Sequence, residues 1–189
     1  EEEEKNSVKS RFNLPLDKVI ISSFQRDTEG SDLKTPKLEK GPDIFCNVVA
    51  EISKEKDVHV LLNGWRRQFV INELNKLEVP YTYYELPDIR EVVRMYSATD
   101  LYIVGSRVEG GPQSLLECAI TKTPILTTDV GMARDIISEK CITENFDNIS
   151  DLMKFSFDEI ETNYNNVQKF LIEDHVEKYD MLFEKILEA

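Results

Sequence analysis

Short β-rich runs alternate with helical periods along most of this chain, and that alternation is the strongest constraint on its fold. Strand-like runs occupy residues 18–23, 58–62, 81–84, 101–104, 124–128 and, weakly, 140–142. Apolar residues recur with helical spacing between several of these runs, and most connections are only a few residues long. A strand followed by a helix, repeated five times, predicts an α/β fold: a Rossmann-like, doubly wound parallel sheet.

Three segments show the helical spacing most clearly. Their apolar positions fall within residues 44–52, 89–96 and 115–120. The second segment follows Pro87, and Asp88 and Glu91 have the spacing of a capping box at its start.

The chain divides into three parts. Residues 1–16 form an acidic lead-in, residues 17–147 carry the strand and helix pattern, and residues 148–189 have the spacing of amphipathic C-terminal helices. These helices either pack on the sheet or reach for a partner domain that is absent here. Residues 25–41 form a long polar link between the first strand and its helix, and such loops tend to be functional or mobile.

Composition excludes several classes of protein. The hydrophobic fraction of 41% is enough for a core, but no apolar run approaches the length of a transmembrane helix. The net charge of -13 argues against a nucleic-acid partner, which would require clustered Lys and Arg. Cys46, Cys118 and Cys141 are widely spaced and odd in number, which predicts buried free thiols in a reducing cytoplasm, not a disulfide or metal site.

The carboxyl ends of the strands are where an open parallel sheet binds ligands. The first strand is followed by Arg26, and its helix begins after Lys40 and Gly41, with Pro42 at the first helical position. A helix N-terminus beside two cations predicts a phosphate site. The alternative is that Lys40 is one of several lysines in a solvated loop.

The second and third strands end in less specific features. Gly64 either allows close approach of a ligand or only makes a turn, and Arg66 and Arg67 either add cationic charge or pair with surface acids. Leu86, with Pro87, either forms the wall of a nucleobase pocket or packs structurally. The chain contains no GxGxxG motif, which argues against a nicotinamide or flavin dinucleotide fold.

The fourth strand end carries the most specific motif, "SRVEGGPQSLLECAI", residues 106–120. Gly110 and Gly111 precede Pro112, where we expect a helix to begin with its free amides toward the ligand edge. Glu109 lies in the turn, and Glu117 lies about one and a half turns into the helix, within reach of a ribose diol. A carboxylate pair for hydrolysis is the rival interpretation.

The stretch "EGGPQSLLE", residues 109–117, resembles the E-x7-E signature of retaining group-1, glycogen-synthase-like glycosyltransferases with the two-domain GT-B architecture. The order of the surrounding features agrees: a strand ending in Arg, then Lys-Gly opening a helix, then "MYSATDLYIVGSRVEGGPQSLLECAITKTPILTTDVG". The resemblance covers roughly residues 17–140, and the tail is similar to the terminal helices of the family.

The resemblance implies the C-terminal half of such an enzyme, which binds the nucleotide-sugar donor. Arg26 and Lys40 would bind the diphosphate, and Glu109 would hold hydroxyls of the donor sugar. The remaining donor-binding positions implied are Gly64, Leu86, Gly110, Gly111, Pro112, Gln113, Ser114 and, for the ribose, Glu117. No metal and no cofactor are expected, because cations and helix amides neutralise the leaving diphosphate. The N-terminal acceptor domain would be missing in cis, so little or no turnover is expected from this chain alone.

Two departures from the family pattern leave alternatives open. Fourteen positions separate Arg26 from Lys40, so Lys34 or Lys37 is an alternative phosphate ligand, and Gly131 stands where the family tends to have two glycines. A nucleotide-sugar epimerase of the same architecture and a degenerate, non-enzymatic interaction domain are the competing functions. The chain's two histidines, His59 and His175, have positions typical of structural residues.

Overall fold

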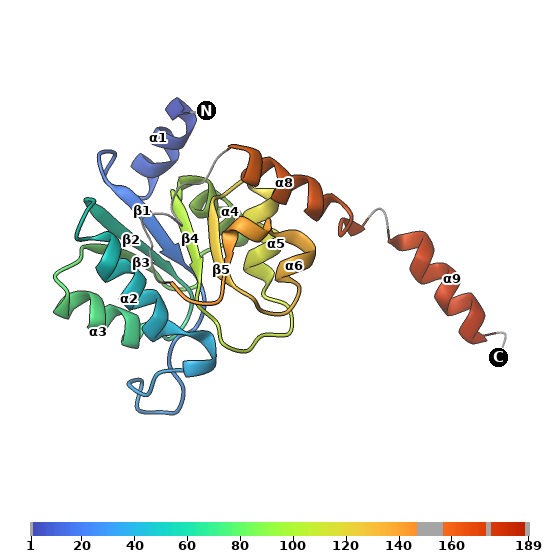
Figure 1. Cartoon of the computed structure of the whole chain (residues 1–189), viewed down its shortest axis with the longest axis horizontal. Helices are drawn as coiled ribbons and strands as arrows, with labels where there is room; N and C mark the ends of the chain where they lie inside the picture. The colour runs from blue at the N-terminus through green and yellow to red at the C-terminus, as the bar shows by residue number, and fades with distance from the viewer. Residues whose placement is uncertain (1, 147–156, 173–174, 188–189) are drawn as a thin grey trace.

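The computed structural model describes residues 2–146, 157–172 and 175–187. Its centre is a six-stranded sheet in the order β3-β2-β1-β4-β5-β6, in which every pair of neighbouring strands is parallel (Figure 1). The strands are β1 (Val19–Ser23), β2 (Val58–Asn63), β3 (Tyr81–Tyr84), β4 (Leu101–Val104), β5 (Ile125–Thr128) and β6 (Ile142–Thr143). The predicted doubly wound parallel sheet is confirmed. The strand order reverses between β1 and β4, where such sheets place their ligand crevice.

Helices cover both faces of the sheet. The helices of the domain are α1 (Glu2–Arg11), α2 (Pro42–Ile52), α3 (Gln68–Lys76), α4 (Ile89–Ala98), α5 (Gln113–Ile120) and α6 (Ala133–Ile136), with short 3-10 turns at η1 (Leu38–Lys40) and η2 (Glu139–Cys141). Along β1, Ile21 packs with α2 and α3, whereas Ile20 packs with residues of α4. This alternation of buried side chains explains why the strands are apolar on both faces.

The predicted elements differ from the structure mainly at their ends. The run at 81–84 and the run at 101–104 coincide with β3 and β4. The weak run at 140–142 instead overlaps the last two residues of η2, and β6 begins only at Ile142. Pro112 caps α5, which begins one residue later than predicted, at Gln113.

The predicted capping box of α4 is wrong in its second half. The Asp88 carboxylate accepts a hydrogen bond from the Arg90 amide, as an N-cap should. Glu91 does not reach back to the cap. Its carboxylate accepts two hydrogen bonds from Arg11 at 2.8 and 2.9 Å and so ties α1 to α4.

The acidic lead-in is packed onto the domain. Lys9, on α1, is buried and forms a 2.8 Å ion pair with Asp100 at the start of β4. Phe12 and Leu14 then enter a cluster with Ile20 and other buried residues. The predicted lead-in therefore contributes buried residues to the domain.

The C-terminal helices behave differently from each other. α8 (Phe157–Gln168) packs against α5 and α6, with Val167 buried. α9 (Val176–Leu187) extends away from the domain and buries none of its residues (Figure 1). The predicted boundary at residues 147–148 lies outside the described residues.

Two smaller predictions concern the cysteines and the histidines. The three cysteines are free and buried, as expected, and burial raises the pKa of the Cys46 thiol to about 12. His59 bonds to the Thr82 hydroxyl at 2.8 Å, and the His175 ring lies 3.1 Å from the Leu171 carbonyl oxygen. Both histidines thus have structural partners.

Candidate functional site

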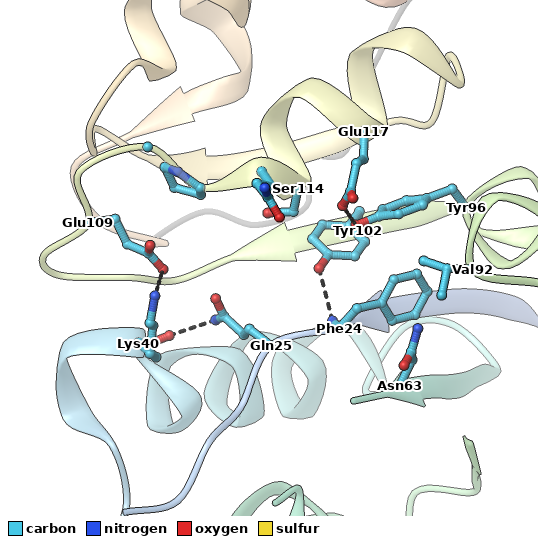
Figure 2. A pocket seen from close by; sticks show the side chains of 13 residues that line it. Phe24, Gln25, Lys40, Asn63, Val92, Tyr96, Tyr102, Glu109, Ser114 and Glu117 are labelled. Atoms are coloured by element: carbon cyan, nitrogen blue, oxygen red, sulfur yellow. Dashed lines mark hydrogen bonds and ion pairs between the residues drawn. The ribbon is translucent and has the colours of Figure 1, made fainter. Parts of the chain in front are cut away.

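A cavity of about 440 Å³ opens at the carboxyl ends of β1, β2 and β4, beside the first turn of α5 (Figure 2). It is lined by Phe24, Gln25, Lys40, Asn63, Val92, Tyr96, Tyr102, Glu109, Gly111, Pro112, Gln113, Ser114 and Glu117. Its place at the reversal of strand order is the place where open α/β sheets bind ligands. Seven of the predicted site residues are among these thirteen: Lys40, Glu109, Gly111, Pro112, Gln113, Ser114 and Glu117.

Lys40 and Glu109 face each other across the cavity and form an ion pair with 2.5 Å between Nζ and Oε1 (Figure 2). Their side chains are 27% and 10% exposed, so the pair is largely shielded from water. The Ser106 hydroxyl donates a further hydrogen bond of 3.0 Å to the same carboxylate oxygen. Two donors thus hold the Glu109 carboxylate in this position.

Gly41 positions Lys40 through a close backbone contact. A Cβ at Gly41 would lie 1.7 Å from the Gly105 carbonyl oxygen, and the φ of Gly41 is +61°. Only glycine fits both conditions. The Gly41 amide donates to the Leu38 carbonyl at 3.0 Å. The residue serves to bring η1 and α2 against the end of β4.

The turn before α5 is supported by the loop after β5. A Cβ at Gly131, whose φ is +53°, would lie 2.5 Å from the Gly110 carbonyl oxygen. Gln113 and Ser114 form the first turn of α5 beside the cavity, and amides of a first helical turn have no partner within the helix. The cavity therefore meets the positive end of a helix dipole.

Aromatic side chains form the inner wall. Phe24 packs edge-on against Tyr96 and Tyr102, and its amide donates to the Tyr102 hydroxyl at 2.9 Å. The Tyr96 hydroxyl donates to Glu117 at 2.6 Å. Burial raises the pKa of Tyr96 well above its usual value, so this phenol stays protonated and orients the carboxylate.

Sequence reasoning missed six lining residues: Phe24, Gln25, Asn63, Val92, Tyr96 and Tyr102. Phe24, Gln25 and Asn63 lie at or just beyond the ends of β1 and β2, so the rule that ligands bind at strand ends could have found them. Tyr96 was recognised only as an apolar position of a helix. Its role depends on Glu117, and no local pattern joins two residues 21 positions apart.

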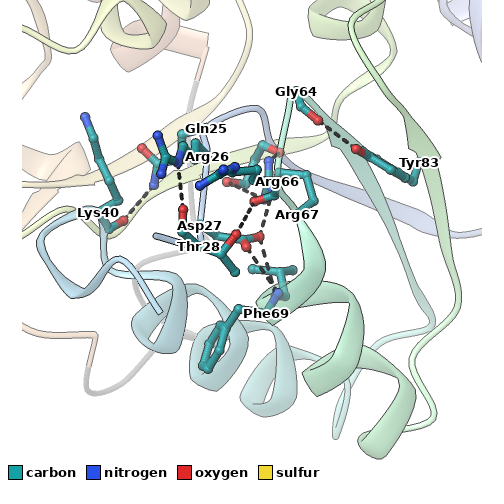
Figure 3. Close-up of polar contacts among 12 residues, drawn as sticks. Gln25, Arg26, Asp27, Thr28, Lys40, Gly64, Arg66, Arg67, Phe69 and Tyr83 are labelled. Atoms are coloured by element: carbon teal, nitrogen blue, oxygen red, sulfur yellow. Dashed lines mark hydrogen bonds and ion pairs between the residues drawn. The ribbon is translucent and has the colours of Figure 1, made fainter. Parts of the chain in front are cut away.

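Four predicted site residues lie outside the cavity lining: Arg26, Gly64, Leu86 and Gly110. The Arg26 side chain donates to the Thr28 carbonyl at 2.6 Å (Figure 3). Its guanidinium lies 5.7 Å from the centre of the Trp65 ring. Gly64, at φ +102°, passes close to the Phe24 carbonyl. Leu86 is 70% exposed, so it is not the packed residue of the alternative interpretation.

The two arginines after Gly64 have separate environments. Arg67 is fully buried and pairs with Asp27, so the prediction of pairing with surface acids is wrong for this residue. Arg66 stacks over Trp65 at 4.4 Å and donates to the Gly30 carbonyl at 2.7 Å. Neither arginine lines the cavity. Of the candidate lysines Lys34, Lys37 and Lys40, only Lys40 does so.

Comparison with known proteins identifies the family. Residues 34–152 match the family described as glycosyl transferases group 1. The chain belongs to this family. It is 22% identical over 151 residues to the O-antigen biosynthesis glycosyltransferase WclY of Escherichia coli, in an alignment covering 79% of this chain and 39% of WclY. The chain thus spans less than half the length of that relative.

Solved structures with a similar fold belong to longer proteins. A glycosyltransferase from Rickettsia africae gives a TM-score of 0.76 at 17% identity, covering 99% of this chain and 52% of its own. Sucrose-phosphate synthase from Thermosynechococcus elongatus gives a TM-score of 0.73 at 15% identity, covering 97% of this chain and 49% of the synthase. Anabaena Alr3699/HepE, solved in complex with UDP-glucose, gives a TM-score of 0.72 at 11% identity, covering 97% of this chain and 53% of HepE. Identities this low show a shared fold and nothing more.

Two further properties concern metals and membranes. Within residues 2–146, 157–172 and 175–187, no group of three or more His, Cys, Asp or Glu side chains is arranged to hold a metal ion. None of the helices in those ranges has both the length and the apolar character needed to span a bilayer.

Proposed function

We propose that this chain is the donor-binding half of a retaining glycosyltransferase. It would bind a nucleoside-diphosphate sugar, whose sugar is transferred to an acceptor held by a separate N-terminal domain. The observation that carries the proposal is the convergence of Lys40, Glu109, Glu117 and the first turn of α5 on one cavity. The cation and the helix amides match a diphosphate. The two carboxylates match the hydroxyls on either side of that diphosphate.

In this proposal the diphosphate lies at the N-terminus of α5, with Lys40 as its cation. Backbone amides of Gln113 and Ser114 and the helix dipole favour a negatively charged group there. Fixed donors of this kind stabilise the charge that develops on the leaving diphosphate, so no metal or cofactor is required. Arg26 is the second proposed cation, since Gln25 beside it already lines the cavity.

The two carboxylates would bind hydroxyls on opposite sides of the diphosphate. Glu109 would accept hydrogen bonds from the donor sugar once Lys40 turns to the diphosphate. Glu117, oriented by Tyr96, would accept them from the ribose. These roles are supported by the resemblance of residues 109–117 to the E-x7-E signature of retaining transferases.

Family membership favours glycosyl transfer over the epimerase alternative. The ion pair and helix amides in the cavity also favour a working site over a degenerate interaction domain. We infer a cytoplasmic location from the three buried free thiols. We also expect little or no turnover without an acceptor domain.

The test is a thermal-shift panel of the chain with UDP, GDP, ADP and dTDP and their common sugar conjugates. A ligand at 100 times its dissociation constant adds about 2.7 kcal/mol of stability. For a domain of this size the expected rise in Tm is roughly 5–10 °C. EDTA should leave the shift unchanged. The absence of a shift with every compound would contradict the proposal, and a strict magnesium requirement would contradict the metal-free mechanism.

A further inference from the structure

Arg67 is the largest fully buried side chain of the domain, and all of its partners lie at the ends of β1 and β2 or just beyond them. Its Nη1 donates to the carbonyl oxygens of Ser23 at 2.5 Å and Asn63 at 2.8 Å. Its Nη2 lies 3.4 Å from the Ser23 hydroxyl, and its Nε donates to Asp27 at 2.9 Å. One guanidinium therefore joins the last residues of two neighbouring strands.

Asp27 extends this connection into the loops. Its carboxylate also accepts from the amides of Phe69 and Val70, at 3.2 and 3.4 Å, in the first turn of α3 (Figure 3). The backbone amide of Asp27 donates to the Arg66 carbonyl at 3.1 Å, and the Asp27 carbonyl accepts from the backbone amide of Lys37 at 2.8 Å. The loop after β1 and the turn after β2 are thus fastened to each other through Asp27.

The residues held by this pair adjoin the cavity. Phe24 and Gln25 follow Ser23 directly, and Asn63 is itself bonded to Arg67; all three line the cavity. Arg26, the proposed second cation, precedes Asp27. Displacing the Arg67 guanidinium would therefore move one wall of the cavity together with the backbone that carries Arg26.

Stability alone is a poor explanation for such a pair. A buried ion pair is often no more stabilising than apolar side chains of the same volume, because both charges lose their hydration. What a guanidinium offers is a planar fork that fixes several acceptors in defined directions, which a lysine cannot do.

We propose that Asp27 and Arg67 are positioning residues for the donor site, which hold the ends of β1 and β2 in the arrangement that binds the diphosphate. This inference rests on the proposed function. It assigns a task to two residues that do not line the cavity and are 40 positions apart.

The chain supplies its own reporter of this arrangement. Trp65 is the only tryptophan, it lies in the turn between Asn63 and Arg67, and it is 50% exposed, with Arg26 and Arg66 stacked against it. Quenching of its fluorescence by acrylamide measures how that turn is packed, and it needs no nucleotide.

The main variant is Arg67→Lys, which keeps the positive charge and removes the fork. We expect far-UV circular dichroism to be retained. The ligand is whichever of UDP, GDP, ADP and dTDP raises the Tm of the wild-type protein most. Its dissociation constant should rise about 10-fold or more in the variant, because small misplacements in a site are costly. Acrylamide quenching of Trp65 without nucleotide should increase.

Asp100→Asn is the matched control. Asp100 pairs with the buried Lys9 at the opposite, amino-terminal end of the sheet, and neither residue lines the cavity. This variant should lower Tm while leaving both nucleotide affinity and Trp65 quenching at wild-type values. If Arg67→Lys does not fold, the double variant Asp27→Asn/Arg67→Gln replaces it, because it leaves no uncompensated charge.

The outcomes separate the two proposals. In one outcome, the wild-type protein binds a diphosphate while Arg67→Lys, or the double variant, binds it no more weakly than Asp100→Asn does. That result would overturn the positioning role and leave the proposed function standing. Wild type that binds none of the four diphosphates would overturn the proposed function and the donor-site role with it. In that case unchanged Trp65 quenching in the variant would also show that the pair does not hold the turn.

Discussion

Lys40 and Glu109 neutralise each other across the cavity, so a diphosphate must compete with a carboxylate for the ammonium group. The 2.5 Å contact and its shielding from water give that competition a real cost. In the proposed function, donor binding would have two linked consequences at the residue scale. Lys40 would move its charge to the diphosphate, and Glu109 would be released to accept hydrogen bonds from sugar hydroxyls.

Arg26 must leave the Thr28 carbonyl to reach a diphosphate, and its substitution tests whether it does. Arg26→Ala is expected to weaken nucleoside-diphosphate affinity by ~1.5–3 kcal/mol, the range for a hydrogen bond to a charged group. Lys34→Ala, in the exposed part of the same loop, should change it little. Isothermal titration of both variants decides the matter: equal losses would mean that Arg26 is the wrong cation.

Glu117→Ala should lower nucleotide affinity, by ~1.5–3 kcal/mol, since it removes a charged acceptor proposed for the ribose. Circular dichroism should show an intact fold, because Glu117 lines the cavity on a helix whose core contacts come from other residues. Tyr96→Phe is the control, as it deletes only the hydroxyl that orients the carboxylate. A Glu117→Ala dissociation constant equal to wild type would refute the ribose contact.

At the scale of elements, the cavity depends on how closely η1, α2 and β4 approach one another. Gly41→Ala would place a Cβ 1.7 Å from the Gly105 carbonyl oxygen at a φ of +61°. We expect it to destabilise the fold by at least ~2 kcal/mol, since backbone must move. Gly110→Ala meets nothing within 4 Å and should be near neutral. Urea midpoints compare the two, and similar midpoints would mean that the close approach is not required.

Most elements could be predicted from local pattern, whereas their connections could not. β3 and β4 had the predicted bounds because each is a short run between clear breaks, and α5 began within one residue of its predicted start. α1 is so highly charged that its packing on α4 gave no apolar signal. The pairing of Asp27 with Arg67 depends on which strands are neighbours, and that is decided by the folded sheet.

The same limit applies to the candidate site. Lys40, Glu109 and Glu117 were predicted from residue type and position at strand ends, and the sheet brings them to one cavity. The position of Arg26 depends on a ring contact with Trp65 from another loop, and the aromatic wall depends on packing between α4, β4 and the end of β1. Such contacts leave no mark on the spacing of residues along the chain.

At the scale of the whole molecule, the Asp100 carboxylate links the acidic start to the sheet. Asp100 accepts from the Ile20 amide at 2.8 Å and pairs with Lys5 and Lys9. Burial acts to raise the pKa of Asp100, but the amide and the two lysines outweigh it, and the pKa lies below its usual value. The folded state therefore holds this proton less tightly than the unfolded chain does.

The sign of the pH dependence follows from that difference. The stability contributed by Asp100 is present above the unfolded pKa, about 3.9, and is lost as the pH falls through the lower folded value. Urea unfolding between about pH 7 and pH 3 should show the free energy of unfolding falling on acidification, with a smaller fall in Asp100→Asn. Asp43 and Glu91, whose pKa values are also lowered, remain in the variant, so a residual dependence is expected. Parallel curves for the two proteins would mean that α1 is held by its apolar contacts and not by this carboxylate.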